Sequence, residues 1–114
     1  MTEQTIDRRT FDELKDTAGA EFVSELVDTF LVEGPAMLDE LRRALAAKEP
    51  DKFRRAAHSL KSNSNTFGAL PLGMMARELE LSGMDPEKAN DAKLDALAAE
   101  YSKVAAALTE LKNA

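Results

Sequence analysis

The chain of 114 residues contains no cysteine and no tryptophan, and only one histidine and one tyrosine. The lack of cysteine excludes a disulfide scaffold and a thiolate metal site, and it permits a reducing compartment without proving one. Few residues are β-branched, whereas alanine, leucine and methionine are frequent, and this balance favours helices over strands. The composition therefore predicts an all-α protein.

Long hydrophobic runs are missing as well. No apolar run approaches the ~20 residues that span a bilayer, and the N-terminal residues 1–4 are polar and acidic, unlike a signal peptide. We therefore expect a soluble, cytoplasmic protein with no membrane partner. Hydrophobic residues make up 44% of the chain, which excludes extensive disorder, and the length predicts one domain over residues 1–114, with its core at about 10–112.

Negative charge predominates, with a formal net charge of −6, so nucleic acid is a poor partner. The acidic residues are unevenly distributed. Residues 52–77 contain none, but they contain five cations: Lys52, Arg54, Arg55, Lys61 and Arg77. Such a stretch is either a solvated helix face or part of a site, and Arg77 alone is expected to be a solvated charge. The stretch matters because it includes His58.

The spacing of apolar residues predicts five helices. A capping box, with Thr10 as N-cap and Glu13 three residues later, begins a short helix that ends near Gly19. A long helix follows over residues 20–47. Gly34-Pro35 lies inside it, and because proline removes a backbone donor and clashes with the preceding turn, we expect a kink or short break there.

The third helix is predicted to begin at residues 49–51, with Asp51 as N-cap, and to end at about residue 67. A fourth runs from about residue 70 to Gly83, with Met74 and Met75 in the core, and the last covers residues 91–112. Because the connections are short, the long helices should pack as an antiparallel up-and-down four-helix bundle, with the N-terminal helix as a short addition.

His58 does not belong to the apolar stripe of the third helix. At ~100° per residue, one direction is shared by six core candidates: Phe53, Ala56, Ala57, Leu60, Ser64 and Phe67. His58 lies roughly 140° from that direction, on the outer face. Arg54 and Arg55 are one turn before it, and Lys61 and Ser62 are one turn after it. We expect the exposed surface around the imidazole to be cationic or small.

That setting suits carriage of a phosphoryl group. An imidazole with a pKa near ~6.5 is largely neutral and nucleophilic at physiological pH, and nearby Lys and Arg side chains can screen a bound phosphoryl group. Ser59, Ser62 and Asn65 are short enough to let another protein approach. Phosphoryl transfer generally needs a divalent metal held by carboxylates. Because none is near His58 in sequence, we expect the metal to come with the partner.

Other chemistries lack their motifs. A Ser-His-Asp triad would need a buried histidine and an activated serine, and the chain has no G-x-S-x-G. A metal site inside a bundle uses Glu-x-x-His pairs, but Arg55 stands three residues before His58. There is no P-loop and no G-x-G-x-x-G, so we expect no ATP binding and no bound cofactor.

Residues 57–69, AHSLKSNSNTFGA, resemble the histidine-containing phosphotransfer (HPt) domain of bacterial multistep phosphorelays, whose pattern is approximately A-H-x-L-K-G-x-S-x-x-x-G-A. Seven positions match: Ala57, His58, Leu60, Lys61, Ser64, Gly68 and Ala69. Residues 75–80, followed by Gly83, resemble the next helix of the family. Ser62 departs from the pattern, because the family most often has glycine there, which bears on how closely a partner docks.

The resemblance implies a stand-alone phosphocarrier, not an enzyme with its own kinase. A response-regulator or hybrid-kinase receiver domain, carrying Mg²⁺, would donate a phosphoryl group from aspartate to Nε2 of His58, and a second receiver aspartate would remove it. Lys61 would steady the phosphoryl charge, and Arg54, Arg55, Ser62 and Asn65 would flank the contact. A monomer is expected. The alternative is a non-catalytic helical adaptor in which His58 is only a surface contact.

Overall fold

The computed structural model describes residues 5–113, and all of its regular elements are helices. The polar segment 1–4, used above against a signal peptide, lies outside the described residues. The helices are α1 (Arg8–Ala18), α2 (Ala20–Ala47), α3 (Pro50–Thr66), α4 (Leu70–Glu80) and α5 (Asp91–Asn113). The prediction of an all-α protein is confirmed. None of the described helices is long and apolar enough to cross a membrane.

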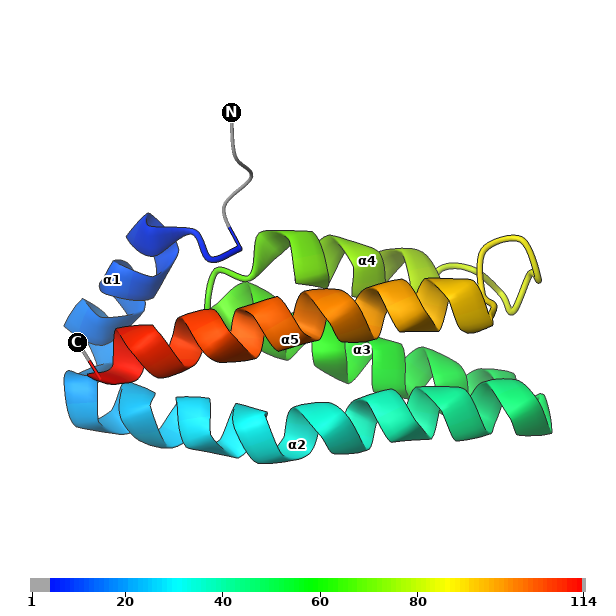
Figure 1. Ribbon diagram of the computed structural model, residues 1–114, viewed down its shortest axis with the longest axis horizontal. Coiled ribbons are helices and arrows are strands. Elements are labelled where there is room, and N and C mark those ends of the chain that lie inside the picture. Colours follow the sequence, from blue (N-terminus) through cyan, green and yellow to red (C-terminus); the bar gives the residue numbers. More distant parts are fainter. Residues whose placement is uncertain (1–4, 114) are drawn as a thin grey trace.

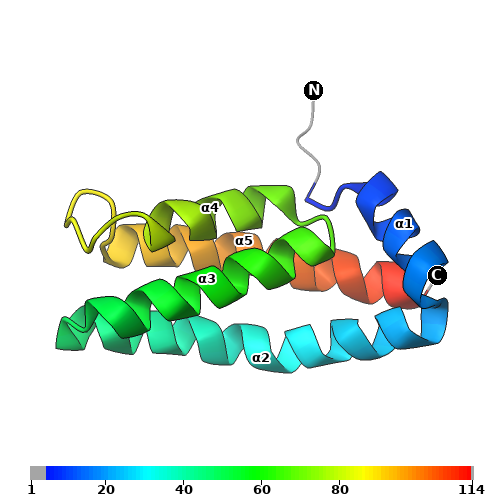
Figure 2. The same ribbon diagram turned by 180° about the vertical axis from the view of Figure 1, so that it is seen from behind.

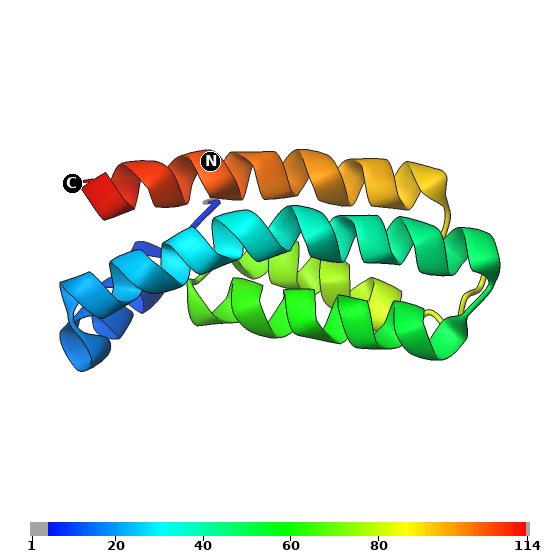
Figure 3. The same ribbon diagram turned by 90° about the horizontal axis from the view of Figure 1, so that it is seen from below.

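Helices α2, α3, α4 and α5 lie side by side, and α1 lies across one end of them (Figure 1). The pairs α2–α3, α3–α4, α4–α5 and α2–α5 are in contact. α5 lies in front in Figure 1 and α3 lies in front in Figure 2, so these two helices are diagonally opposite. The view from below shows α2 between α3 and α5 (Figure 3). One helix face of α3 is consequently left open on the outside.

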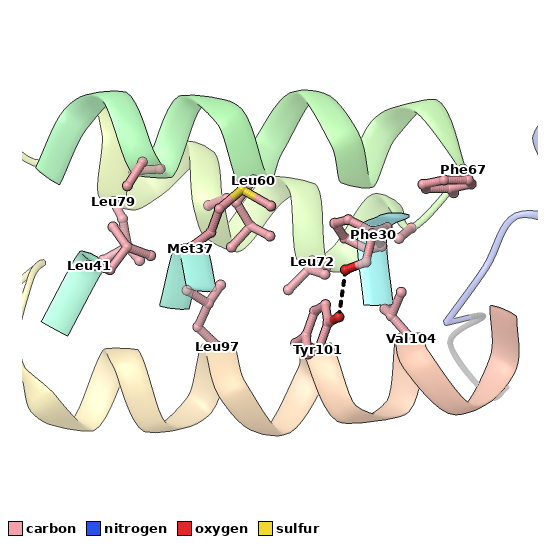
Figure 4. Close-up of a cluster of buried hydrophobic side chains, with 14 of the residues drawn as sticks. Phe30, Met37, Leu41, Leu60, Phe67, Leu72, Leu79, Leu97, Tyr101 and Val104 are labelled. Atoms are coloured by element: carbon pink, nitrogen blue, oxygen red, sulfur yellow. Dashed lines mark hydrogen bonds between the residues drawn. The ribbon is translucent and has the colours of Figure 1, made fainter. Parts of the chain in front are cut away.

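The core forms where the predicted apolar stripes meet. The six stripe residues predicted for the third helix are all buried, and so are Leu94, Leu97, Tyr101, Val104 and Leu108 of α5. Figure 4 shows this layer, with α2 side chains filling the space between α3 and α5. Methionine was less predictable. Met75 packs partly buried against the core, as expected, whereas Met74 is 65% exposed, so its assignment to the core is wrong.

α2 runs without a break through Pro35, so of the expected kink or short break the short break is absent. Pro35 is exposed, but Gly34 faces the interior. A Cβ at Gly34 would lie 2.3 Å from the ring of Tyr101, and the Tyr101 hydroxyl donates to the carbonyl of Phe30 at 2.9 Å (Figure 4). Glycine at this position therefore provides space for a tyrosine from α5.

Both predicted N-caps are misplaced. α1 begins at Arg8 with Asp7 as its N-cap, and Thr10 is inside the helix, where its hydroxyl donates to the Asp7 carboxylate. α3 begins at Pro50 with Glu49 as its N-cap, which places Asp51 in the first turn. Proline is well suited to a first turn because a backbone N–H there would have no acceptor within the helix, so proline loses no hydrogen bond. Acidic residues near the start of a helix are favourable in either place.

Replacing Gly34 with alanine should lower the free energy of unfolding by about 1–3 kcal/mol, because the added methyl overlaps the Tyr101 ring. Urea unfolding followed by circular dichroism measures this change. Glu33→Ala, one residue away on the exposed side of α2, serves as the control and should stay within ~0.5 kcal/mol of the unmodified chain. Equal stability of both variants would contradict close packing at Gly34.

Candidate functional site

His58 lies on the exposed face of α3, as the helical wheel predicts. Its side chain is 56% exposed, while Ala57 and Leu60 on either side of it are fully buried. α3 is fixed by its core stripe, including Ser64, whose hydroxyl donates to the Leu60 carbonyl at 2.6 Å. The bond satisfies a polar group that would otherwise be costly to bury. The backbone under His58 is thus rigidly held, while the ring reaches solvent.

A carboxylate from the neighbouring helix contacts the imidazole. Glu80, in the last turn of α4, places Oε2 2.7 Å from Nδ1 of His58. Its Oε1 lies 2.7 Å from Nζ of Lys61, and the Glu80 side chain is only 13% exposed. The surroundings of His58 were expected to be cationic or small, and that expectation is wrong. One anionic group bridges the two residues of α3 that carry the motif.

The two contacts keep Glu80 ionised. The hydrogen bond from Lys61 is the main cause that lowers the pKa of the Glu80 carboxyl below its ordinary value of 4.5, and His58 adds to it, whereas burial acts in the opposite direction. An ionised carboxylate can only accept hydrogen bonds. Nδ1 of His58 is therefore the protonated nitrogen, and in a neutral ring the lone pair is on Nε2. Nε2 is then the ring nitrogen with a free lone pair.

Close packing of α3 against α4 accompanies these contacts. Gly73 is buried on α4, and a Cβ at this position would lie 2.1 Å from Oδ1 of Asn65 on α3. Glu80 follows Gly73 by seven residues, two helical turns further along the same face. Gly73 lets the two helices approach closely, and the carboxylate of Glu80 contacts α3 two turns further along α4. We call this line of contacts, made by Asn65 and His58 of α3 with Gly73 and Glu80 of α4, the α3–α4 seam.

The other predicted site residues surround His58 without contacting it by hydrogen bonds. Arg54, Arg55 and Ser62 are exposed on α3. Nε of Arg55 donates to the backbone carbonyl of Asp51 at 3.4 Å. Arg55 also lines a hollow of about 560 Å³ between α2 and α3, on the side of α3 that faces away from α4. Arg77 is exposed on α4, as predicted for a solvated charge. The candidate site therefore consists of His58, Lys61 and Glu80 in contact, with exposed polar residues around them.

Sequence reasoning missed Glu80 as a site residue. The signal was present in the repeat of Leu72, Ala76 and Leu79, which defines the core side of α4 and places Glu80 at its edge. Pairing that edge with His58 requires the register of α4 against α3, which periodicity alone does not provide. Within residues 5–113, no group of three or more His, Asp or Glu side chains is placed to hold a metal ion.

Comparison with known proteins finds a matching family and a similar fold. Residues 25–114 match the family model of the Hpt domain. The fold is similar to the crystal structure of histidine-containing phosphotransfer protein B (HptB) from Pseudomonas aeruginosa PAO1. The two share 26% sequence identity with a TM-score of 0.88, over 98% of this chain and 97% of that one. No curated protein matches the sequence.

Glu80→Gln should lower the free energy of unfolding at pH 7 by about 1–2 kcal/mol, because it removes a charge-assisted hydrogen bond and leaves Lys61 without its carboxylate. Because folding lowers the pKa of the Glu80 carboxyl, the ionised group gives its full stabilisation of the fold above about pH 5. This stabilisation is lost as the pH falls below 4.5, the ordinary pKa of the carboxyl, and through its lowered pKa in the folded protein. The difference between the two chains should therefore shrink in acid.

Chemical denaturation at several pH values tests this dependence. Glu78→Gln is the matched control, since Glu78 is exposed on the same helix, and it should leave the free energy of unfolding within ~0.5 kcal/mol of the unmodified value. If the difference in free energy of unfolding between Glu80→Gln and the unmodified chain stayed constant from pH 7 to pH 3, the charge of Glu80 would not be what stabilises the fold.

Proposed function

This chain belongs to the Hpt domain family, and from that premise we propose that His58 is the residue on which it carries a phosphoryl group. The family supplies the general role, which is phosphotransfer in phosphorelays by a phosphocarrier without kinase activity of its own. Hpt domains interact with receiver domains of response regulators and hybrid kinases. The observation that carries the assignment to His58 is an exposed imidazole whose Nδ1 is held by Glu80.

In the proposed reaction, a receiver domain presents an aspartyl phosphate to the outer face of α3. Nε2 of His58 attacks phosphorus, a new N–P bond forms, and the P–O bond to the aspartate breaks, so that the aspartate leaves as a carboxylate. The phosphorylated ring keeps its proton on Nδ1, where Glu80 accepts the hydrogen bond at 2.7 Å. Positive charge that develops on the ring is thereby stabilised by a fixed anion. Transfer to a second receiver aspartate reverses these steps.

Lys61 has two roles in this proposal. In the resting protein its ammonium group lies on Oε1 of Glu80, which keeps the carboxylate charged and in place. Its side chain is 24% exposed and starts one turn after His58, so the ammonium group can also offer a hydrogen bond to the phosphoryl oxygens. We propose that the docked receiver is bordered by Arg54, Arg55, Ser62 and Asn65. At position 62 it meets a serine side chain, where the family most often has glycine.

Several finer features belong to the same proposal. The protein acts as a stand-alone, monomeric carrier in the cytoplasm and as one domain over the whole chain, without nucleic-acid or membrane partners. Mg²⁺ is supplied by the receiver. Helices α2–α5 form an antiparallel up-and-down bundle. The short connections between α2 and α3 and between α3 and α4 support this arrangement. So does the chain direction in Figure 1, where the colours advance from left to right along α2 and α4 and from right to left along α3 and α5. In such a bundle, His58 and Glu80 are on adjacent helices that are rigid supports.

The proposed function is tested by incubating the chain with Mg²⁺ and a receiver domain that carries a ³²P-labelled aspartyl phosphate. Label that is stable in base and labile in acid should move to the unmodified chain and not to His58→Gln. Glu78→Gln, at an exposed position of α4, should accept label like the unmodified chain. Label in the His58→Gln variant would place the acceptor elsewhere. Receiver binding that survives His58→Gln, with no label on the unmodified chain, would indicate an adaptor instead.

A further inference from the structure

The outer side of α4 carries an apolar stripe that the core does not explain. Leu70, Met74 and Leu81 are 46%, 65% and 65% exposed, respectively, although each is a large hydrophobic residue. Together with the exposed Arg77 they are spaced four, three and four residues apart, which is the spacing of one helix face. We call these four residues the α4 ridge. An exposed apolar patch of this kind commonly marks an interaction surface.

The α4 ridge is next to the α3–α4 seam, which includes His58. Gly73 and Glu80 of α4 face α3, where they meet Asn65 and His58. Each is flanked in sequence by ridge residues, since Met74 follows Gly73 and Leu81 follows Glu80. At ~100° per residue the ridge is displaced from the α3-facing side of α4 by roughly a quarter of a turn. The ridge is therefore on the part of the α4 surface adjacent to the α3–α4 seam.

We propose that the α4 ridge is part of the surface that a receiver domain covers when it reaches His58, a proposal that rests on the proposed function above. The imidazole contacts α4 through Nδ1 and Glu80, so a partner that reaches Nε2 docks close to the α3–α4 seam. A specific interface buries about 800 Å² on each partner. We infer that a footprint of that size around His58 extends onto α4, where the ridge supplies the exposed side chains.

The chemistry of the ridge fits that occupant. A receiver that presents an aspartyl phosphate and a carboxylate-bound Mg²⁺ has an acidic centre. Arg77, in the middle of the ridge, is exposed and provides a cation among its apolar side chains. Apolar side chains on either side of it give the contact its buried area, and aliphatic contacts around a polar centre are a common interface arrangement. The ridge thus combines attraction for the phosphorylated partner with apolar area for it to cover.

The test uses the double variant Met74→Gln/Leu81→Gln, which removes apolar surface without adding charge. The matched control is Ala99→Gln/Ala106→Gln, at exposed positions of α5, which lies across the bundle from α3 (Figures 1 and 2). Label transfer is measured over a range of concentrations of the phosphoreceiver that labels the unmodified chain. The ridge variant should show a fall in kcat/KM of about tenfold, mainly through a higher KM. The α5 variant should change less than about twofold, as expected for a surface substitution outside an interface.

Binding of the unphosphorylated receiver, measured by fluorescence titration, separates this inference from the proposed function. If no receiver passes label to the unmodified chain, the phosphotransfer proposal fails, and the ridge is judged by binding alone. Receiver binding and transfer that are the same in the ridge and α5 variants would overturn the ridge proposal. So would loss of a self-associated form in sedimentation with unchanged transfer, because the ridge would then join two copies of this chain. Thermal unfolding checks that both variants are folded.

Discussion

The carboxylate of Glu80 is the group on which the geometry of the site depends. It is nearly buried between α3 and α4, and a buried charge is costly unless it is paired. Two partners on α3 meet that requirement, since Lys61 contacts one oxygen and His58 contacts the other. The same contacts fix which nitrogen of His58 carries its proton. A single electrostatic constraint thereby orients the imidazole, leaves the lone pair on Nε2 in a neutral ring and ties the two helices together.

This constraint operates only because the bundle sets the distance between α3 and α4. The buried stripe of α3 and the small residues on the facing side of α4 allow close approach, and Gly73 is in contact distance of Asn65. A larger residue at position 73 would force α4 away from α3 at a point two turns from Glu80. On the far side of the core, Gly34 makes the corresponding space for Tyr101. Fold and site thus share one packing problem, in which glycines decide how near two helices come.

Much of this could be predicted from the sequence because periodicity is a local property. The apolar stripe of α3 placed His58 on the exposed face, and the structure confirms that placement. The ends of α2 and α5 were also predictable, because apolar spacing and turn residues define them. The N-caps at Thr10 and Asp51 were wrong, since several acidic or hydroxyl residues near a helix start compete for the same position and only neighbouring structure selects one. Pro35 did not break α2, since tertiary packing overrides local preference in a helix of 28 residues.

Glu80 and Met74 show where such reasoning stops. Both lie on α4, and both depend on how α4 is rotated and shifted against α3, which no spacing within α4 contains. Sequence reasoning did not predict that the Glu80 carboxylate is 13% exposed and paired with α3, and it wrongly placed Met74, which is exposed, in the core. In the proposed reaction these two departures belong together. The carboxylate is already engaged by His58 and Lys61, so the metal of phosphoryl transfer falls to the partner's carboxylates, and the exposed apolar surface beside it gives that partner a place to dock. A carrier built this way contributes orientation and surface, while the phosphoryl group and its metal arrive together on the receiver.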